Sequence, residues 1–183
     1  MNMDLQKEQT ISSEYLYKGK IVNLRFDKVS LQNGNTSTRE IVEHPGGVCI
    51  LALDENQNVL LVKQYRRPMD DFLLELPAGK IDPKEEPYHC GMRELEEETG
   101  YRTDEMIDLG KAYLSPGYSN EMIYMYMAEN LIKGTLNPDE DEFLNVSRMP
   151  LTELVEKVMT GEILDAKTCI ATLKAKVILE NRK

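Results

Sequence analysis

The most constraining feature of this chain is a dense cluster of glutamates at a set spacing behind a glycine. Five residues lie between Gly79 and Glu85, and seven more lie between Glu85 and the segment Arg93-Glu94-Leu95-Glu96-Glu97-Glu98-Thr99-Gly100-Tyr101. On a helix, residues three and four apart are neighbours, so several of these carboxylates would share one side. Such a cluster is costly to fold unless cations neutralise it, and hard divalent cations such as Mg²⁺ prefer oxygen ligands. The alternative is a solvated acidic face, since the chain has 32 acidic residues.

The residues around the cluster predict a helix over residues 86–98. Pro87 suits the first turn of a helix, and Gly100 lies where a left-handed residue commonly ends one. Side chains that can pack on a core recur at helical spacing. This inward stripe consists of Tyr88, Met92, Leu95 and Thr99.

Three strand-like runs precede the motif and predict a small antiparallel β appendage over residues 1–44. The last two runs are separated by Asn33-Gly34-Asn35, which is a strong hairpin turn signal. His44-Pro45-Gly46-Gly47 then punctuates the chain, so we expect a second domain over residues 45–183. The three expected strands cover residues 11–17, 21–30 and 38–42.

The rest of the chain alternates short strands with helices. Thr152 and Asp165 are expected to cap two C-terminal helices, the first of which ends at Gly161. The last helix is expected to turn Ile170, Leu173 and Val177 inward. Strands are expected at residues 48–53, 59–64, 72–76, 106–114, 122–127 and 143–146. Strands placed first and between helices favour an α+β fold or a mixed sheet flanked by helices.

Composition excludes several classes of function. The formal charge of −10 argues against a nucleic-acid or membrane-surface binder, which needs a basic face. No run of about 18 apolar residues occurs, and the N-terminus lacks a signal-peptide pattern. Cys49, Cys90 and Cys169 are an odd number without metal-like spacing, so we expect reduced thiols and a cytoplasmic protein.

The segment from Gly79 to Tyr101 resembles the Nudix box, the signature of enzymes that hydrolyse a nucleoside diphosphate linked to another group. The resemblance implies an α/β/α sandwich with a mixed sheet, added to the β appendage. It also implies two or three Mg²⁺ ions in each active site, with Mn²⁺ as a substitute. Water would attack one phosphorus of the diphosphate, without a covalent protein nucleophile.

Residue roles follow from the same resemblance. Arg93 matches the arginine that orients the glutamates, and it can also form an ion pair with Glu97 one turn on. Glu140, in the acidic loop, matches the position of the general base. The implied catalytic residues are therefore Arg93, Glu97 and Glu140. Glu85 matches a structural or weakly metal-associated position. The implied metal ligands are the carbonyl of Ala78 and the carboxylates of Glu94, Glu97, Glu98 and Glu142.

A second resemblance narrows the substrate. Pro116 lies 16 residues beyond Gly100, where ADP-ribose pyrophosphatases carry a marker proline. Further segments resembling bacterial members of that group are Tyr17-Lys18-Gly19-Lys20-Ile21, Arg39-Glu40-Ile41-Val42-Glu43-His44, Gln64-Tyr65-Arg66-Arg67-Pro68 and Glu75-Leu76-Pro77-Ala78-Gly79. In this group two subunits exchange the appendage, which implies a domain-swapped homodimer. The implied substrate-binding residues are Lys20, Ile21, Arg39, Glu40, Arg66, Lys80, Ser115, Pro116, Gly117, Tyr118 and Glu121.

Several alternatives stay open from the sequence. Arg66 could form a surface salt bridge while Arg67 takes its role, and His44 could be purely structural. The turn at Pro116 could be an ordinary β-turn, and the acidic loop over residues 139–142 could be merely solvated. The first functional hypothesis is Mg²⁺-dependent hydrolysis of ADP-ribose to AMP and ribose 5-phosphate. The alternatives are hydrolysis of ADP-glucose, another nucleotide sugar or a dinucleotide, and a nucleotide-sensing Nudix domain without turnover.

Overall fold

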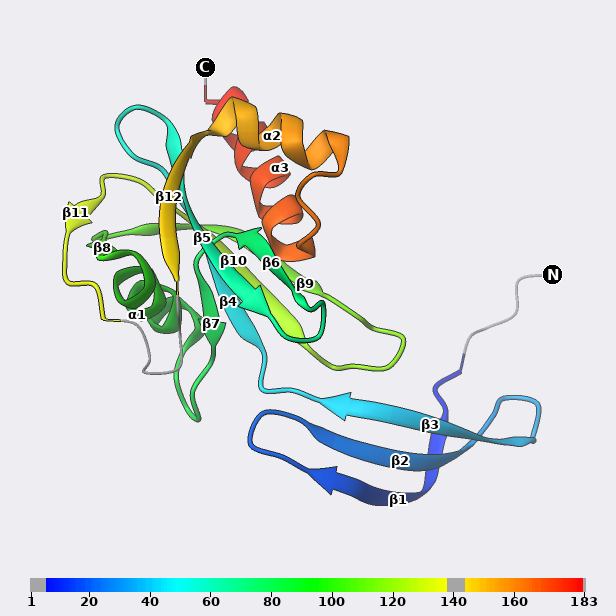
Figure 1. The fold of residues 1–183 in the computed structure, drawn as a ribbon. Coiled ribbons are helices and arrows are strands. Elements are labelled where there is room, and N and C mark those ends of the chain that lie inside the picture. Colours follow the sequence, from blue (N-terminus) through cyan, green and yellow to red (C-terminus); the bar gives the residue numbers. More distant parts are fainter. Residues whose placement is uncertain (1–5, 138–143, 183) are drawn as a thin grey trace. The chain divides into compact units, whose positions relative to one another are not determined.

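The computed structural model describes residues 6–137 and 144–182, and these form two units (Figure 1). The first unit combines Met1–Pro45 with Tyr113–Met122. The second combines Gly46–Ala112 with Ile123–Lys183. Among the described helices, none combines the length and the apolar character that a membrane crossing requires.

The first unit contains the expected antiparallel sheet of three strands in the order β1-β2-β3. The hairpin between β2 and β3 turns at Gly34, whose φ of 83° is a left-handed conformation that favours glycine. The β1–β2 pairing is interrupted by two irregularities of register along β1. The strands are β1 (Gln9–Lys18), β2 (Asn23–Ser30) and β3 (Thr36–Glu43).

The second unit is built on a mixed sheet of four strands in the order β7-β4-β10-β9. In this sheet β4 pairs parallel with β10 and antiparallel with β7. Two smaller sheets have the orders β12-β5-β6 and β11-β8. The strands are β4 (Gly47–Ala52), β5 (Asn58–Arg66), β6 (Asp71–Glu75), β7 (Ala78–Lys80), β8 (Tyr101–Arg102), β9 (Met106–Tyr113), β10 (Met122–Ala128), β11 (Ile132–Lys133) and β12 (Asn145–Pro150).

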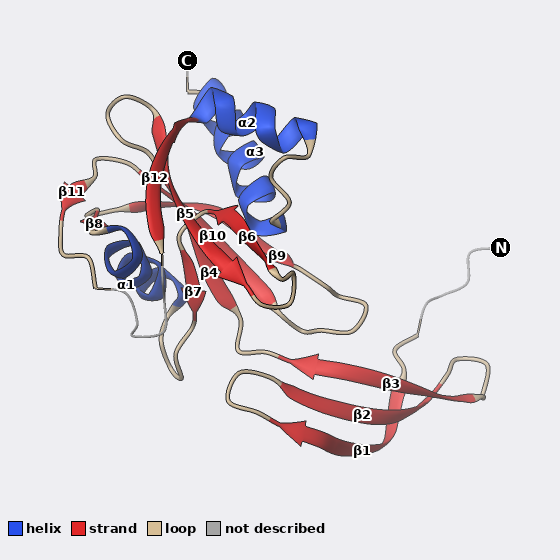
Figure 2. Ribbon diagram, viewed as in Figure 1, coloured by secondary structure: helices blue, strands red, loops and turns tan. Residues whose placement is uncertain are grey.

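Helices cover both faces of this sheet, as expected for an α+β fold of the α/β/α type (Figure 2). Helices α1 (Pro87–Thr99) and α3 (Ala166–Glu180) both contact β4, and α2 (Leu151–Thr160) contacts β5, β12 and α3. Every residue of β4 is buried, because a strand covered on both faces must be apolar on both. On the α1 side the core includes Val48, Ile50, Leu60 and Leu95.

Helix α1 agrees with its sequence pattern. Pro87 opens the helix, and Gly100 ends it in a left-handed conformation with φ of 71°. Leu95 and Thr99 are buried, and Tyr88 and Met92 pack against the core beside them. The helix is therefore held by its inward stripe, which fixes the direction in which its glutamates point.

Some expectations about the C-terminal region are wrong. Helix α2 begins at Leu151 after Pro150, so Thr152 does not cap it, whereas Asp165 caps α3 by accepting a hydrogen bond from Thr168 N at 3.1 Å. The last strand is β12 rather than residues 143–146, and β7, β8 and β11 have no counterpart among the expected strands.

The inward face of α3 also differs from the expectation. Leu173 and Val177 are exposed and Ile170 is half-buried. The buried face consists of small and polar residues, which permit close packing on the sheet: Lys167, Thr168, Ala171, Thr172 and Ala175.

Candidate active site

The glutamate cluster is organised by Arg93, which lies at the centre of α1. Its Nε and Nη2 atoms donate to the two oxygens of Glu85, each at 2.9 Å. Its Nη1 atom donates to Glu94 Oε1 and to Glu97 Oε2, each at 2.8 Å. The ion pair between Arg93 and Glu97 that the helical spacing predicts is therefore present. One guanidinium holds three carboxylates in set positions, although the three together carry excess negative charge.

The segment over residues 76–80, which includes strand β7 and is called the loop below, meets α1 at two backbone positions. The N–H of Ala78 donates to Glu98 Oε2 at 2.8 Å. Gly79 packs so closely on the Glu94 carboxylate that an added Cβ would overlap its carboxyl atoms. Glycine is required here for close approach, because its backbone brings the loop against two buried glutamates. Ala78, Glu94 and Glu98 are thereby gathered in one place.

The contacts within this cluster shift the pKa values of several of its side chains. Hydrogen bonds from Arg93 lower the pKa of Glu85 from 4.5 to about 2. The hydrogen bonds to Glu85, with the charges of Glu94 and Glu97, raise the pKa of Arg93. Burial first, and Glu85 second, raise the pKa of the Cys90 thiol, which argues against a nucleophilic cysteine. All three cysteines are free thiols, as expected for reduced residues.

The donor set fits a hard divalent cation in its chemistry. The available groups are carboxylates and backbone carbonyls, which Mg²⁺ prefers, and Gly79 lets the backbone run close to the Glu94 carboxylate. Within the described part of the chain, no three acidic, histidine or cysteine side chains already form a cluster that could hold a metal. In this structure Glu94 and Glu97 each direct one carboxylate oxygen at Arg93.

Arg66, a predicted substrate contact, lies at the end of β5 and forms a two-point ion pair with Glu75. Its Nε donates to Oε1 at 2.7 Å and its Nη2 to Oε2 at 2.8 Å. Glu75 is fully buried, whereas the Arg66 side chain is 39% exposed. The pair is thus a salt bridge that anchors Arg66 on the interior and leaves part of its side chain accessible. Arg67, its alternative, is exposed and pairs with Asp70 at 3.2 Å.

Lys80 lies at the end of β7 with an exposed side chain. Its carbonyl oxygen accepts a hydrogen bond from Arg93 Nη2 at 3.4 Å and from the Cys90 thiol at 3.3 Å. The backbone of Lys80 therefore belongs to the framework around Arg93, and its ammonium group faces solvent.

The remaining predicted substrate contacts lie in the first unit. Lys20 and Ile21 form the exposed tip of the β1–β2 turn, where Gly19 N donates to Val22 O at 3.0 Å. Arg39 and Glu40 lie side by side in β3. Arg39 makes an exposed ion pair with Glu8, in which its Nε and Nη2 atoms donate to the two carboxylate oxygens. Its Nη1 atom donates to Ser37 Oγ and to Thr38 O.

The segment with the predicted marker proline is bound to β3. Val42 donates to Tyr118 O at 2.8 Å and accepts from Asn120 N at 3.3 Å, so the segment continues the strand pattern. His44 donates its N–H to Asn120 Oδ1 at 2.8 Å, and its ring lies 3.8 Å from Glu121. Ser115, Pro116, Gly117 and Tyr118 form a tight turn, closed by Tyr118 N donating to Ser115 O at 3.2 Å. The structure thus brings this segment together with the strand of Arg39 and Glu40.

Glu140 and Glu142 lie outside the described residues. The chain that leads to them is held against α1, because Asn137 N donates to Glu97 O at 3.0 Å and Thr135 N donates to Glu96 Oε1 at 3.2 Å. After them, β12 pairs with β5. Their assignment stays a prediction.

Three residues near the site were missed by sequence reasoning: Glu75, Lys167 and Thr168. Lys167 binds Glu75, and Thr168 Oγ1 accepts a hydrogen bond from Leu76 N at 2.9 Å, although 92 residues separate each pair. The sequence offered one indirect signal for these residues, which was Asp165 as the expected cap of the last helix. In the structure Asp165 accepts hydrogen bonds from both Lys167 and Thr168.

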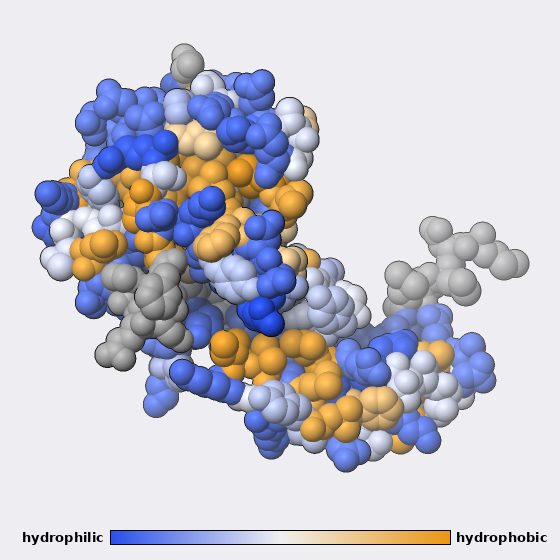
Figure 3. Space-filling model, in the orientation of Figure 1, coloured by the Kyte–Doolittle hydropathy of each residue, from blue (hydrophilic) through white to orange (hydrophobic). Residues whose placement is uncertain are grey.

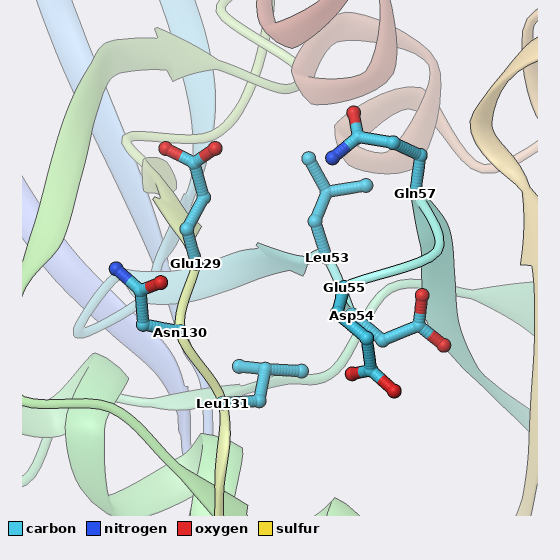
Figure 4. A pocket seen from close by; sticks show the side chains of 7 residues that line it. All are labelled: Leu53, Asp54, Glu55, Gln57, Glu129, Asn130 and Leu131. Atoms are coloured by element: carbon cyan, nitrogen blue, oxygen red, sulfur yellow. The ribbon is translucent and has the colours of Figure 1, made fainter.

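A separate hollow in the second unit has no residue in common with the glutamate cluster (Figure 4). Its acidic side chains are engaged, because Asp54 lies 3.5 Å from Arg148 and Glu129 lies 2.6 Å from Arg182. It is lined by Leu53, Asp54, Glu55, Gln57, Glu129, Asn130 and Leu131.

Comparison with known proteins finds matches over both units of the chain. Residues 43–168 match the NUDIX domain family, and residues 8–42 match the nucleoside diphosphate sugar hydrolase N-terminal domain. The chain is 39% identical over 181 residues to the ADP-ribose pyrophosphatase of Bacillus subtilis (strain 168), covering 97% of this chain and 98% of the relative. It is 41% identical over 169 residues to the methanol dehydrogenase activator of Bacillus methanolicus, covering 91% of each.

Among solved structures, the crystal structure of an ADP compounds hydrolase superposes with a TM-score of 0.88 at 22% identity, covering 99% of this chain and 98% of that one. At this identity the likeness concerns the fold. The family match spans the loop at Gly79 and the whole of α1, which hold the carboxylates described above. The chain is a member of the Nudix family.

Proposed function

We propose that this protein hydrolyses the diphosphate of ADP-ribose to AMP and ribose 5-phosphate. The observation that carries the proposal is the arrangement of Arg93, which holds Glu94 and Glu97 at 2.8 Å while Glu98 binds the loop at Ala78. Such an arrangement suits divalent cations, which would neutralise the charge of a diphosphate so that water can attack a phosphorus. The B. subtilis ADP-ribose pyrophosphatase, similar over almost the whole chain, supports the choice of substrate.

We assign the cofactor as Mg²⁺, with Mn²⁺ as a substitute and two or three ions in each site. The carbonyl of Ala78 and the carboxylates of Glu94, Glu97, Glu98 and Glu142 would hold them. A bound divalent cation supplies charge neutralisation for the diphosphate and lowers the pKa of water. Gly79 keeps the loop close to Glu94, and Arg93 sets the rotamers of the glutamates.

We assign the remaining roles by position. Glu97 lies at the surface of the cluster, and Glu140 is proposed as the general base on the strength of the family resemblance. Arg66 presents an accessible guanidinium edge suited to a phosphate or ribose oxygen. The other substrate contacts are proposed to be Lys20, Ile21, Arg39, Glu40, Lys80, Ser115, Pro116, Gly117, Tyr118 and Glu121.

The protein is proposed to act as a domain-swapped homodimer in the cytoplasm. Every residue of β1 is exposed, including Ile11, Tyr15, Leu16 and Tyr17. Figure 3 shows hydrophobic residues on this three-stranded sheet. A ten-residue strand with apolar side chains on both faces has the character of a surface that a second copy covers. In this arrangement residues 1–44 serve dimerisation and the substrate pocket, and residues 45–183 form the hydrolase domain.

A panel of nucleotides tests the substrate. Purified protein is incubated with Mg²⁺ and ADP-ribose, ADP-glucose, GDP-mannose or NAD, and the products are resolved by chromatography. We expect AMP and ribose 5-phosphate from ADP-ribose, and EDTA should stop the release until Mg²⁺ is restored. A kcat/KM more than about tenfold higher for another nucleotide would overturn the assignment in favour of the alternative substrate class.

Nucleotide sensing without turnover is the other hypothesis, and one relative is named as an activator of methanol dehydrogenase. The complete set of Glu94, Glu97 and Glu98 favours catalysis, since a binding module has no need of all three. Binding of ADP-ribose in the panel without any product would support sensing instead.

A further inference from the structure

The strongest feature outside the glutamate cluster is a buried group of charges that joins α3 to β6. The carboxylate of Glu75 accepts from Arg66 on one side and from the ammonium of Lys167 on the other. Lys167 also lies 3.0 Å from Asp165 Oδ1. Two cations and two anions therefore balance, although Glu75 is fully buried and the Lys167 side chain is only 9% exposed.

Because Glu75 and Lys167 are buried, each depends on its charged partners to stay ionised. Desolvation alone would lower the pKa of Lys167, but the carboxylates of Asp165 and Glu75 outweigh it and raise the pKa. Burial would likewise raise the pKa of Glu75, but Arg66 and Lys167 outweigh it and lower the pKa. These shifts keep Glu75 and Lys167 charged, and the removal of one partner leaves an uncompensated charge.

Arg66 is the member of the group that is accessible. Its Nε and Nη2 atoms are used by Glu75, whereas Nη1 makes no hydrogen bond to the residues that the structure describes. The hydrogen bonds that Arg66 donates to Glu75 are the main cause of the raised pKa of Arg66, and the charges of Glu75, Asp165 and Glu98 add to it. Arg66 thus lies within electrostatic reach of the glutamate cluster on α1.

The N-terminal end of α3, which carries Lys167, also holds the loop beside the glutamate cluster. Leu76 N donates to Thr168 Oγ1 at 2.9 Å, Ile50 N donates to Pro77 O at 2.9 Å, and Ala78 N donates to Glu98. Three consecutive residues of the loop are thus bound to three different elements: α3, β4 and α1. The N-terminus of α3 therefore sets the position both of Glu75 and of the backbone next to it.

We propose that Lys167 is a positioning residue for substrate binding: it shares the Glu75 carboxylate with Arg66, so that the Nη1 edge of Arg66 keeps its place for an anionic oxygen of the substrate. The inference rests on the proposed function. Without Lys167, Glu75 and Asp165 would give the group a net negative charge, which opposes a diphosphate. Lys167 itself touches neither the substrate nor the reacting atoms.

Two lysines of α3 provide a matched test. Lys167→Met and Lys174→Met make the same substitution in the same helix with the same change of net charge, but Lys174 binds the carbonyl of Leu109 instead, at 2.6 Å. For ADP-ribose, we expect Lys167→Met to raise KM about tenfold with kcat within about twofold of the wild type. Lys174→Met should change neither constant, and Lys167→Met should add little in an Arg66→Ala background.

A purely structural role for Lys167 gives a different result. In that case Lys167→Met would lower the apparent kcat, because less of the protein is folded, and would leave KM unchanged. The loss of activity in Lys167→Met would also multiply with the loss in Arg66→Ala. Either outcome overturns the inference. If Lys167→Met does not fold, Lys167→Gln replaces it, because the amide can still donate a hydrogen bond to Glu75 although the positive charge is lost. A rise in KM in the same direction is expected, and an unchanged KM would overturn the inference.

A second measurement does not depend on turnover. In protein with ¹⁵N-labelled arginine, the Nε signal of Arg66 reports its hydrogen bond to Glu75. We expect Lys167→Met to shift this signal and to speed exchange of its proton, and Lys174→Met to leave both unchanged. An unaltered Arg66 signal in Lys167→Met would refute the positioning role, even if ADP-ribose proved a poor substrate. A shifted signal, together with no hydrolysis of ADP-ribose by the wild type, would refute only the proposed substrate.

Discussion

The backbone N–H of Ala78 donates to the carboxylate of Glu98 at 2.8 Å, which joins the loop and the helix of the candidate site across 20 residues of sequence. The contact links two groups that are both proposed as metal ligands. It also explains why the loop must run so close to α1 that only glycine fits at residue 79.

Glu98→Gln should separate chemistry from folding. The amide oxygen can still accept the hydrogen bond from Ala78, so the thermal midpoint should change little. The lost charge should lower kcat by at least about 100-fold. Steady-state kinetics with ADP-ribose and a circular dichroism melt measure the two effects. Glu86→Gln, at the exposed start of α1, is the matched control, and normal turnover in Glu98→Gln would contradict the metal assignment.

Gly79→Ala should damage the site by displacement of Glu94. The added methyl group would overlap the carboxylate, so either the loop or the side chain must move. We expect kcat to fall and the Mg²⁺ concentration for half-maximal activity to rise by about tenfold or more. Titration of activity against Mg²⁺ measures this change. An unchanged titration curve would mean that the close approach has no functional role.

Glu85→Gln should make stability less dependent on pH in acid. The pKa of Glu85 falls from 4.5 to about 2 in the folded protein, so its contribution is complete above pH 4.5 and is lost as the pH falls toward 2. The variant should lose roughly 1–2 kcal/mol of unfolding free energy at pH 7 and less at pH 3. Urea unfolding at both pH values tests this. Glu105→Gln, an exposed control, should lose little at either, and equal losses at both pH values in Glu85→Gln would be inconsistent with the shift.

Charge on β1 should dissociate the proposed dimer. Leu16 is 55% exposed in the single chain, and a lysine there would be buried against a second copy. Sedimentation at micromolar concentration should give a dimer for the wild type and a monomer with reduced activity for Leu16→Lys. Met159→Lys, at a site 71% exposed on α2, should stay dimeric. A wild-type monomer would refute the shared site.

Local signals in the sequence were sufficient for α1. Pro87, Gly100 and the inward stripe fix the ends and the rotation of the helix, so the ion pair of Arg93 with Glu97 follows from spacing alone. The contact of Arg93 with Glu85 does not follow, because it depends on the path of the loop before the helix.

Contacts between distant segments could not be predicted in the same way. Hydrophobic periodicity suggested that Leu173 and Val177 face inward on α3, whereas close packing there selects small residues and a paired lysine. Arg66 carried a signal as a candidate contact, but its anchor became visible only when β5 and β6 were paired and α3 was packed beside them. A buried charge is recognised through its partner, and the partner here is 92 residues away.

The link between Glu75 and Lys167 has a consequence for the order of events during synthesis. A ribosome makes the loop at Ala78 and the whole of α1 long before it makes α3. Until Lys167 and Thr168 have emerged, Glu75 has no lysine to share and Leu76 has no hydroxyl acceptor. The growing chain therefore carries its complete signature motif in an unfinished setting, and the hydrolytic centre matures only after α3 has been made.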